Sequence, residues 1–205
     1  MKTEIDPQTV KKLREETGAG MMNCKKALAE NDGNYEKAVE SLKLKGMATA
    51  DKKASRNTNE GMIYSYIHTG NKLGIMVEVN CETDFVARRP EFNELAKNIA
   101  MQIASNPEIE VISYSDISQF VKDKIWNFES GKEDLQNKPE QIRNKIIEGR
   151  VEKNLKKQVL LEQEYIRDPN LTVNDYIKQV ISILGENIRI TRFVRYLLGE
   201  TDNNN

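Results

Sequence analysis

The stretch that decides the fold is residues 61–88, GMIYSYIHTGNKLGIMVEVNCETDFVAR. Its first half is rich in β-branched and aromatic side chains, and in its second half Ile75, Val77 and Val79 alternate with outward-facing positions. Alternation with a period of two predicts a strand with one buried face. Because a glycine-containing turn, His68–Lys72, separates the two runs, the stretch predicts a β-hairpin.

Helical patterns surround this hairpin. Before it, residues 1–46 predict three short helices, the first of which follows the cap residue Asp6. After it, a helix starts near Pro90, and a later helix capped by Thr172 leads to a final strand at Ile188–Val194 that should join the hairpin. Helices mixed with antiparallel strands in this order indicate an α+β fold.

The apolar spacing divides the chain into three parts. Residues 1–46 form a small three-helix module. Residues 47–60 are polar without an apolar stripe, which indicates either a linker or a solvated extension of the third helix. Residues 61–205 form the core, from which an antiparallel helical hairpin at about 115–157 projects. Its expected seam consists of Ile117, Phe120, Val121, Ile125 and Phe128 in the first helix and Ile142, Ile146, Val151 and Leu155 in the second.

Composition narrows the function classes. A net charge of −1 over 205 residues gives no sign of nucleic acid or membrane binding. No apolar run approaches the ~20 residues of a transmembrane helix. The cysteines, Cys24 and Cys81, lack metal-ligand spacing and are interpreted as small buried hydrophobes. The single histidine, His68, accompanies no nucleophile motif, so we expect no enzyme, no metal site and no cofactor.

Five blocks of sequence, in the expected order and between about residues 8 and 200, resemble the elongation factor Ts family. The blocks are Leu13–Leu28, Glu78–Arg88, Lys138–Ile142, Glu148–Arg150 and Gly185–Ile188. Two residues depart from the family pattern. Asn23 stands where many members have Asp, and Arg89 stands where Asn or Asp is more usual.

The resemblance implies a ubiquitin-associated-like N-terminal module and a core with a three-stranded antiparallel sheet and helices on one face. It also implies guanine-nucleotide exchange: the chain would bind GDP-bound and nucleotide-free elongation factor Tu and release GDP without catalysis. Long family members carry two cores in tandem, whereas this chain has room for one. It therefore resembles the short form, in which two chains associate, and we expect a homodimer.

The candidate site centres on a wedge, Thr83-Asp84-Phe85. On local pattern alone Phe85 fits a core position, whereas the resemblance implies that the Asp-Phe pair inserts between helices of the partner's GTPase domain. Asp84 has two alternatives, an N-cap for the following turn or a partner contact. Thr83 is expected to be structural within the wedge.

A second group of candidate partner-binding residues, Arg14, Met21, Met22 and Lys25, lies in the N-terminal module. Two adjacent methionines on a helix cannot both face one small core. We therefore expect Met21 inside and one methionine exposed as an adaptable partner contact. Arg14 and Lys25 taken alone fit solvated charges, and the resemblance implies that the module docks on the GTPase domain through these positions.

His68 ends the first predicted strand, where a lone histidine usually forms a surface hydrogen bond. The resemblance places it near the partner's nucleotide phosphates. In a dimer, His68 of one chain and Phe85 of the other could act on the same partner molecule.

Two other functions compete with exchange. An adaptor would bind ubiquitin-like or peptide partners through the three-helix module, and its function would survive removal of residues 83–85. An RNA-binding protein would depend on Lys52–Arg56, but the near-zero net charge and the lack of a basic aromatic platform argue against it. High usage of Asn, Lys and Ile leaves two locations open, the bacterial cytoplasm and the plastid stroma.

Overall fold

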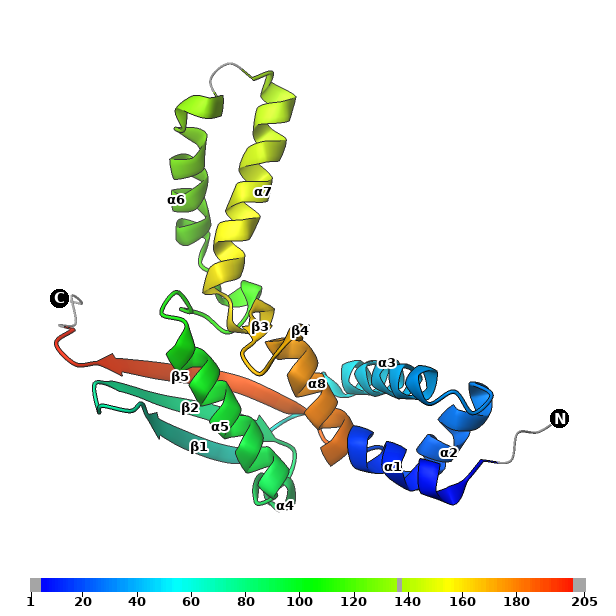
Figure 1. The fold of residues 1–205 in the computed structure, drawn as a ribbon. Helices are drawn as coiled ribbons and strands as arrows, with labels where there is room; N and C mark the ends of the chain where they lie inside the picture. Colours follow the sequence, from blue (N-terminus) through cyan, green and yellow to red (C-terminus); the bar gives the residue numbers. More distant parts are fainter. Residues whose placement is uncertain (1–4, 136–137, 201–205) are drawn as a thin grey trace. The chain divides into compact units, whose positions relative to one another are not determined.

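The computed structural model describes residues 5–135 and 138–200, and its helices and strands confirm the α+β class (Figure 1). The main sheet is antiparallel with the strand order β1-β2-β5, so that β2 is central. A second sheet pairs β3 with β4. The strands are β1 (Glu60–Ile67), β2 (Leu73–Cys81), β3 (Glu164–Tyr165), β4 (Asp168–Thr172) and β5 (Ile188–Leu197).

Within these residues eight α-helices accompany the strands. They are α1 (Pro7–Thr17), α2 (Met21–Glu30), α3 (Tyr35–Lys53), α4 (Asp84–Ala87), α5 (Pro90–Ser105), α6 (Gln119–Ser130), α7 (Glu140–Gln158) and α8 (Val173–Leu184). The described residues divide into two compact units. The first comprises residues up to 63 with 78–96 and 175–189, and the second comprises 64–77, 97–174 and those from 190 onward.

Helices α1, α2 and α3 pack on one another in the first unit. Asp6 accepts hydrogen bonds from the backbone nitrogens of Gln8 and Thr9, both at 3.2 Å, which caps α1 as expected. Their shared core consists of Val10, Leu13, Cys24, Ala27, Leu28, Ala38 and Leu42. The predicted three-helix packing therefore has a core of small and aliphatic side chains.

Helix α3 is longer than the three-helix prediction requires. It continues through residues 47–53 to Lys53, and Ala50 in this extension is buried. Of the two alternatives predicted for residues 47–60, a linker or an extension of the third helix, the extension is therefore present as far as Lys53. The division into 1–46, 47–60 and 61–205 as separate domains stays a prediction.

The two strands of the hairpin approach each other closely at Gly61. Its φ of +147° lies in a region that L side chains rarely adopt, and an added Cβ would lie 2.2 Å from the carbonyl oxygen of Val79. Glycine is therefore required by both the backbone conformation and the space at this position.

The end of helix α5 is tied to strand β5 in the second unit by Arg195. Its guanidinium donates to the backbone oxygens of Ile103 at 2.7 Å, Asn106 at 2.8 Å and Pro107 at 2.8 Å. These carbonyls follow or end the helix and lack intrahelical partners, so the arginine acts as its C-terminal cap.

Helices α6 and α7 pack side by side as the predicted antiparallel hairpin (Figure 1). The buried residues of its seam are Ile117, Leu135, Ile147, Val151, Leu155 and Val159. Three residues expected in the seam are exposed instead: Phe120, Phe128 and Ile142.

Phe120 and Phe128 were wrongly expected in the seam because of the direction in which the seam crosses α6. The seam follows positions four apart, Ile117, Val121, Ile125 and then the buried Glu129. Such a row turns gradually around the helix, and a residue three positions after a seam residue falls outside it. Phe120 and Phe128 occupy these outer positions.

A matched pair of glycine substitutions tests the strand approach. We expect Gly61→Ala to lower the free energy of unfolding by roughly 2 kcal/mol or more, from strain and overpacking. Gly149→Ala in α7, where an added Cβ meets nothing within 4 Å, should raise it by up to about 1 kcal/mol. Urea unfolding followed by circular dichroism measures both, and equal effects of the two substitutions would contradict the account of Gly61.

Candidate partner-binding site

The wedge Thr83-Asp84-Phe85 lies where strand β2 ends and the one-turn helix α4 begins. Phe85 is 79% exposed, whereas the two residues after it, Val86 and Ala87, are buried. Val86 and Ala87 therefore anchor the turn in the core, while the phenyl ring of Phe85 points to solvent. The core position that local pattern suggested for Phe85 is wrong.

Thr83 is the residue that fixes this turn. Its backbone nitrogen donates to Glu186 Oε2 at 3.0 Å, and its Oγ1 donates to Glu186 Oε1 at 2.7 Å. The same Oγ1 accepts from the backbone nitrogen of Val86 at 3.5 Å and so caps α4. Its carbonyl oxygen accepts from Ala87 N at 3.2 Å and from the Cys81 thiol at 3.1 Å.

A second glutamate makes the reciprocal contact: whereas Glu186 binds Thr83 after β2, Glu82 just past the end of β2 binds the residue that follows Glu186. It accepts from the backbone nitrogen of Asn187 at 2.6 Å and pairs with Arg56 at 3.4 Å. The buried Asn187 side chain donates to the backbone oxygens of Ala54 at 3.3 Å and Arg56 at 2.8 Å. We call this set of residues the clasp: Ala54, Arg56, Glu82, Thr83, Glu186 and Asn187.

Asp84 does not cap α4, since it is the first residue with helical geometry and the extended Thr83 precedes it. Its carboxylate instead pairs with Arg88 Nη2 at 2.8 Å, and Arg88 is well exposed. Of the two alternatives for Asp84, the N-cap is therefore wrong. Arg89, one of the departures from the family pattern, pairs with Glu91 at 2.7 Å.

The second predicted group lies at the end of α1 and the start of α2. Arg14, Met22 and Lys25 are exposed. Met21, expected inside, is also 44% exposed. It is the first residue of α2, and the inner stripe of that helix begins at Cys24 and continues with Ala27 and Leu28. Met21 thus precedes the first position at which the helix can reach the small core.

His68 is an exposed residue at the turn between β1 and β2. Its Nδ1 lies 2.9 Å from the hydroxyl of Tyr66, and its backbone nitrogen donates to Leu73 at 2.8 Å. It belongs to the second unit, whereas the wedge belongs to the first. The surface hydrogen bond expected of a lone histidine is present.

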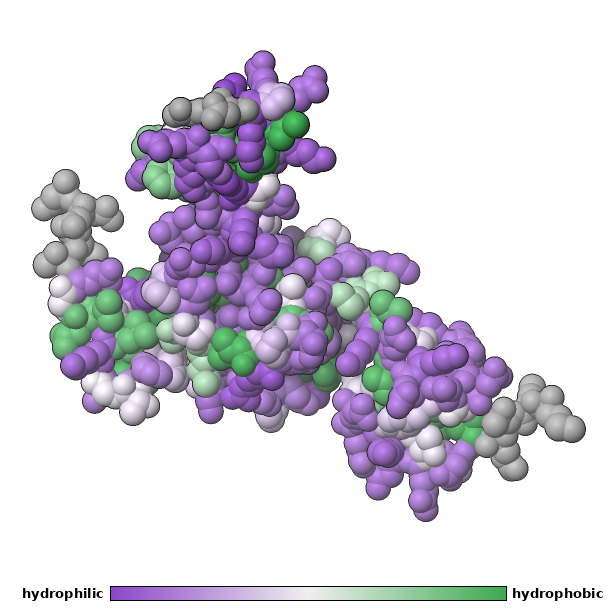
Figure 2. Space-filling view, turned by 45° about the horizontal axis from the view of Figure 1, so that its top comes forward, coloured by the Kyte–Doolittle hydropathy of each residue, from purple (hydrophilic) through white to green (hydrophobic). Residues whose placement is uncertain are grey.

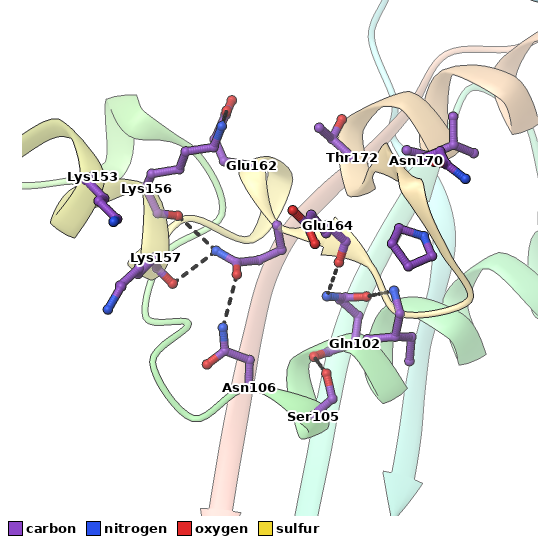
Figure 3. A pocket seen from close by; sticks show the side chains of 14 residues that line it. Gln102, Ser105, Asn106, Lys153, Lys156, Lys157, Glu162, Glu164, Asn170 and Thr172 are labelled. Atoms are coloured by element: carbon purple, nitrogen blue, oxygen red, sulfur yellow. Dashed lines mark hydrogen bonds and ion pairs between the residues drawn. The ribbon is translucent and has the colours of Figure 1, made fainter. Parts of the chain in front are cut away.

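A hollow of about 610 Å³ lies in the second unit among the ends of α5 and α7 and the β3–β4 hairpin (Figure 3). Gln102 holds strand β3 and the turn after it: it donates to Glu164 O at 3.1 Å and accepts from Ile166 N at 2.8 Å. Gln163 Nε2 donates to three backbone oxygens near the end of α7 and so caps that helix. The two amides thus bond mainly to backbone groups and form a structural joint, and none of the predicted site residues lies in the hollow.

Across residues 5–135 and 138–200, no three histidine, cysteine, aspartate or glutamate side chains gather closely enough to hold a metal ion. None of the described helices is long and apolar enough to cross a membrane.

Cys81 takes part in the site through its buried thiol. Burial, reinforced by the nearby Glu186 carboxylate, raises the pKa of Cys81 from 9.0 to about 11. The thiol therefore stays protonated, and able to donate to Thr83, well above neutral pH. Sequence reasoning missed this role because burial alone was expected of the cysteine, and it missed the roles of Glu82, Glu186 and Asn187 because their contacts join positions about a hundred residues apart.

The chain resembles known proteins over nearly its whole length. A family model described as elongation factor Ts matches residues 3–200. The chloroplast elongation factor Ts of Phaeodactylum tricornutum is 76% identical over 202 residues, which cover 98% of this chain and all of that protein. The chloroplast protein of Rhodomonas salina is 56% identical, with 98% and 91% covered. Elongation factor Ts of the cyanobacterium Rippkaea orientalis is 57% identical, with 96% and 79% covered.

The pKa of Cys81 gives a prediction for alkaline pH. The unfolded chain releases this proton near pH 9, whereas the folded chain holds it until about pH 11, so rising pH favours unfolding between these values. The stability advantage of wild type over Cys81→Ala should be complete below pH 9 and shrink by up to about 1.4 kcal/mol per pH unit above it. Urea unfolding of both proteins from pH 8 to 11 measures the difference, and a constant difference would contradict the assignment.

Proposed function

Because the chain belongs to the elongation factor Ts family, we propose that it accelerates GDP release from elongation factor Tu by inserting Phe85 into that partner. Family membership implies a nucleotide-exchange factor of translation elongation rather than an enzyme. The observation that supports the wedge is the combination of a 79% exposed Phe85 ring with Thr83, two residues earlier, whose backbone nitrogen and hydroxyl are both bound to Glu186.

The wedge would act by differential binding. Burial of a phenyl ring gains roughly 1.5–3 kcal/mol. A ligand shifts an equilibrium only by its difference in affinity for the two states, so the ring favours the partner conformation that has room for it. In that conformation the displaced helices of the GTPase domain no longer support Mg²⁺ and its waters, and the diphosphate loses its charge compensation. GTP binding then displaces the factor.

The N-terminal module provides the second part of the proposed interface. Met21 and Met22 are both exposed side by side at the start of α2, and flexible thioether side chains suit an adaptable apolar contact. Arg14 and Lys25 flank them as exposed cations. We assign docking on the GTPase domain to these four residues, with residues 1–46 as the docking part of the chain.

A homodimer is the proposed assembly, and an apolar patch on the second unit supports it. Met76 is exposed between the buried Ile75 and Val77, so it points away from the buried face of the sheet. Val194 and Tyr196 are likewise exposed on either side of Arg195, which reaches back to α5. Ile67 and Leu198 extend the patch, and Figure 2 shows apolar side chains gathered where β5 runs toward the C-terminus.

Several further assignments accompany the dimer. His68 of one chain would contact the partner molecule that Phe85 of the other chain opens, beside the phosphate side of the nucleotide site. Relatives from chloroplasts and cyanobacteria support the plastid stroma or the bacterial cytoplasm as the location. Exchange by this route uses no cofactor, metal, nucleic acid or membrane contact of the factor itself.

Stopped-flow release of a fluorescent GDP from elongation factor Tu tests the wedge. Wild type should accelerate release, and Phe85→Ala should reduce the acceleration about 10- to 100-fold, because burial of the ring is lost. Phe120→Ala removes an equally exposed phenylalanine of α6 and serves as the control with wild-type activity. No acceleration by wild type would overturn the exchange function, and full activity of Phe85→Ala would overturn the wedge assignment.

Light scattering at micromolar concentration tests the assembly. Wild type should have the mass of a dimer, while Ile67→Glu and Tyr196→Glu should give monomers, since each buries a charge in the apolar patch. Phe120→Glu, which changes an exposed phenylalanine outside the patch, should remain dimeric. A monomeric wild type would refute the homodimer.

A further inference from the structure

We propose that Glu186 is a positioning residue for exchange, and that through the clasp it holds the wedge in fixed register with the end of helix α3. This inference rests on the proposed exchange function. It adds a residue that contacts no nucleotide or partner and acts through Thr83.

Every polar group of Thr83 is engaged in a hydrogen bond. Glu186 accepts from both its backbone nitrogen and its hydroxyl, at 3.0 and 2.7 Å. Hydrogen bonds to a carboxylate are about twice as strong as neutral ones. Because the Thr83 hydroxyl also caps α4 and its carbonyl accepts from Ala87, the carboxylate fixes the residue on which the whole turn is built.

Helix α4 depends on this support. It has four residues, Asp84–Ala87, and a single turn costs more in nucleation than its hydrogen bonds return. Val86 and Ala87 anchor the second half of the turn by burial, whereas Phe85 leaves its ring outside and adds no packing of its own. The orientation of the ring therefore depends on tertiary bonds to Thr83 rather than on helix propensity.

Further contacts link the wedge to the N-terminal module. The loop that carries Glu186 also holds the end of α3: Lys53 Nζ donates to Gly185 O, and the Asn187 amide donates to Ala54 O and Arg56 O. One turn earlier, Asp51 pairs with Lys178 of α8 at 2.7 Å.

Helices α3 and α8 also approach each other closely. An added Cβ on Gly46 of α3 would lie 2.8 Å from Ser182 Oγ of α8. The helix that belongs to the docking module is thus joined to the wedge by bonds that converge on residues 185–187.

Preorganisation is the consequence for function. A partner that meets a fixed wedge does not have to order it, so more of the binding free energy remains for opening the nucleotide site. If the Glu186 carboxylate is removed, only a fraction of the docked factor molecules presents the ring correctly at any time. The maximal rate of GDP release is then reduced to that fraction of the wild-type rate. Docking through Met21 and Met22 is unchanged, so the apparent affinity changes less.

The test measures GDP release from elongation factor Tu as a function of factor concentration. For Glu186→Ala we expect a maximal rate about 10-fold below wild type, the equivalent of one lost charge-assisted hydrogen bond, and a half-saturating concentration within about 3-fold. Glu186→Gln keeps one acceptor oxygen and should retain more of the rate. If Glu186→Ala fails to fold by circular dichroism, Glu186→Gln carries the comparison.

A second readout separates positioning from general stability. Hydrogen–deuterium exchange of the free factor should quicken at the amides of residues 84–87 in Glu186→Ala, with other helices as protected as in wild type. Thr83→Val removes the hydroxyl bond to Glu186 but keeps the backbone bond, so the double substitution with Glu186→Ala should lower the rate by less than the two single effects combined. Glu162→Ala, which truncates a partly exposed glutamate paired with Lys156 in the second unit, is the control with unchanged rate and exchange.

Wild-type maximal rates in both Glu186 variants, or a lower rate with unchanged protection of residues 84–87, would overturn this inference alone. Failure of wild type itself to accelerate GDP release would overturn the proposed function, and the inference with it.

Discussion

The paired hydrogen bonds from Thr83 to the Glu186 carboxylate are the interaction on which the site depends. They join two positions 103 residues apart at 3.0 and 2.7 Å. Through them a four-residue helix that could not exist in isolation keeps Val86 and Ala87 inside and Phe85 outside. The buried Cys81 thiol completes the support by donating to the Thr83 carbonyl.

Exposure of an aromatic ring does not by itself identify a binding residue. Phe120 and Phe128 on α6 are 76% and 70% exposed, close to the value for Phe85. What distinguishes Phe85 is the turn that carries it, in which two tertiary hydrogen bonds to Glu186 and the local bonds of Thr83 fix the residue that caps α4. A ring held in this way retains the free energy of its burial for a partner, because little conformational entropy is lost when it binds.

Periodicity and capping predicted the parts of the fold that depend on local sequence. The hairpin of β1 and β2, the Asp6 cap of α1 and the start of α5 at Pro90 all follow from patterns within about ten residues. The β3–β4 pair was not predicted, since its strands are short, contain Pro169 and pair with an irregular register. The predicted burial of Met21 and of Phe120 was wrong. Met21 precedes the first position of α2 that reaches the core of the module, and Phe120 lies beside the row of α6 residues that forms the seam.

The sequence predicted where the candidate site lies, but not the contacts that hold its turn in place. A sequence places Thr83, Asp84 and Phe85 next to one another, yet whether the ring points inward or outward depends on Glu186 and Asn187, which no local pattern connects to them. The most direct test is to replace Phe85 with a photo-crosslinking benzophenone amino acid and irradiate the factor with nucleotide-free elongation factor Tu. If Phe85 is the wedge, the cross-link maps to the GTPase domain of the partner and excess GTP suppresses it. A cross-link within the factor itself, or none to that domain, would contradict the wedge assignment.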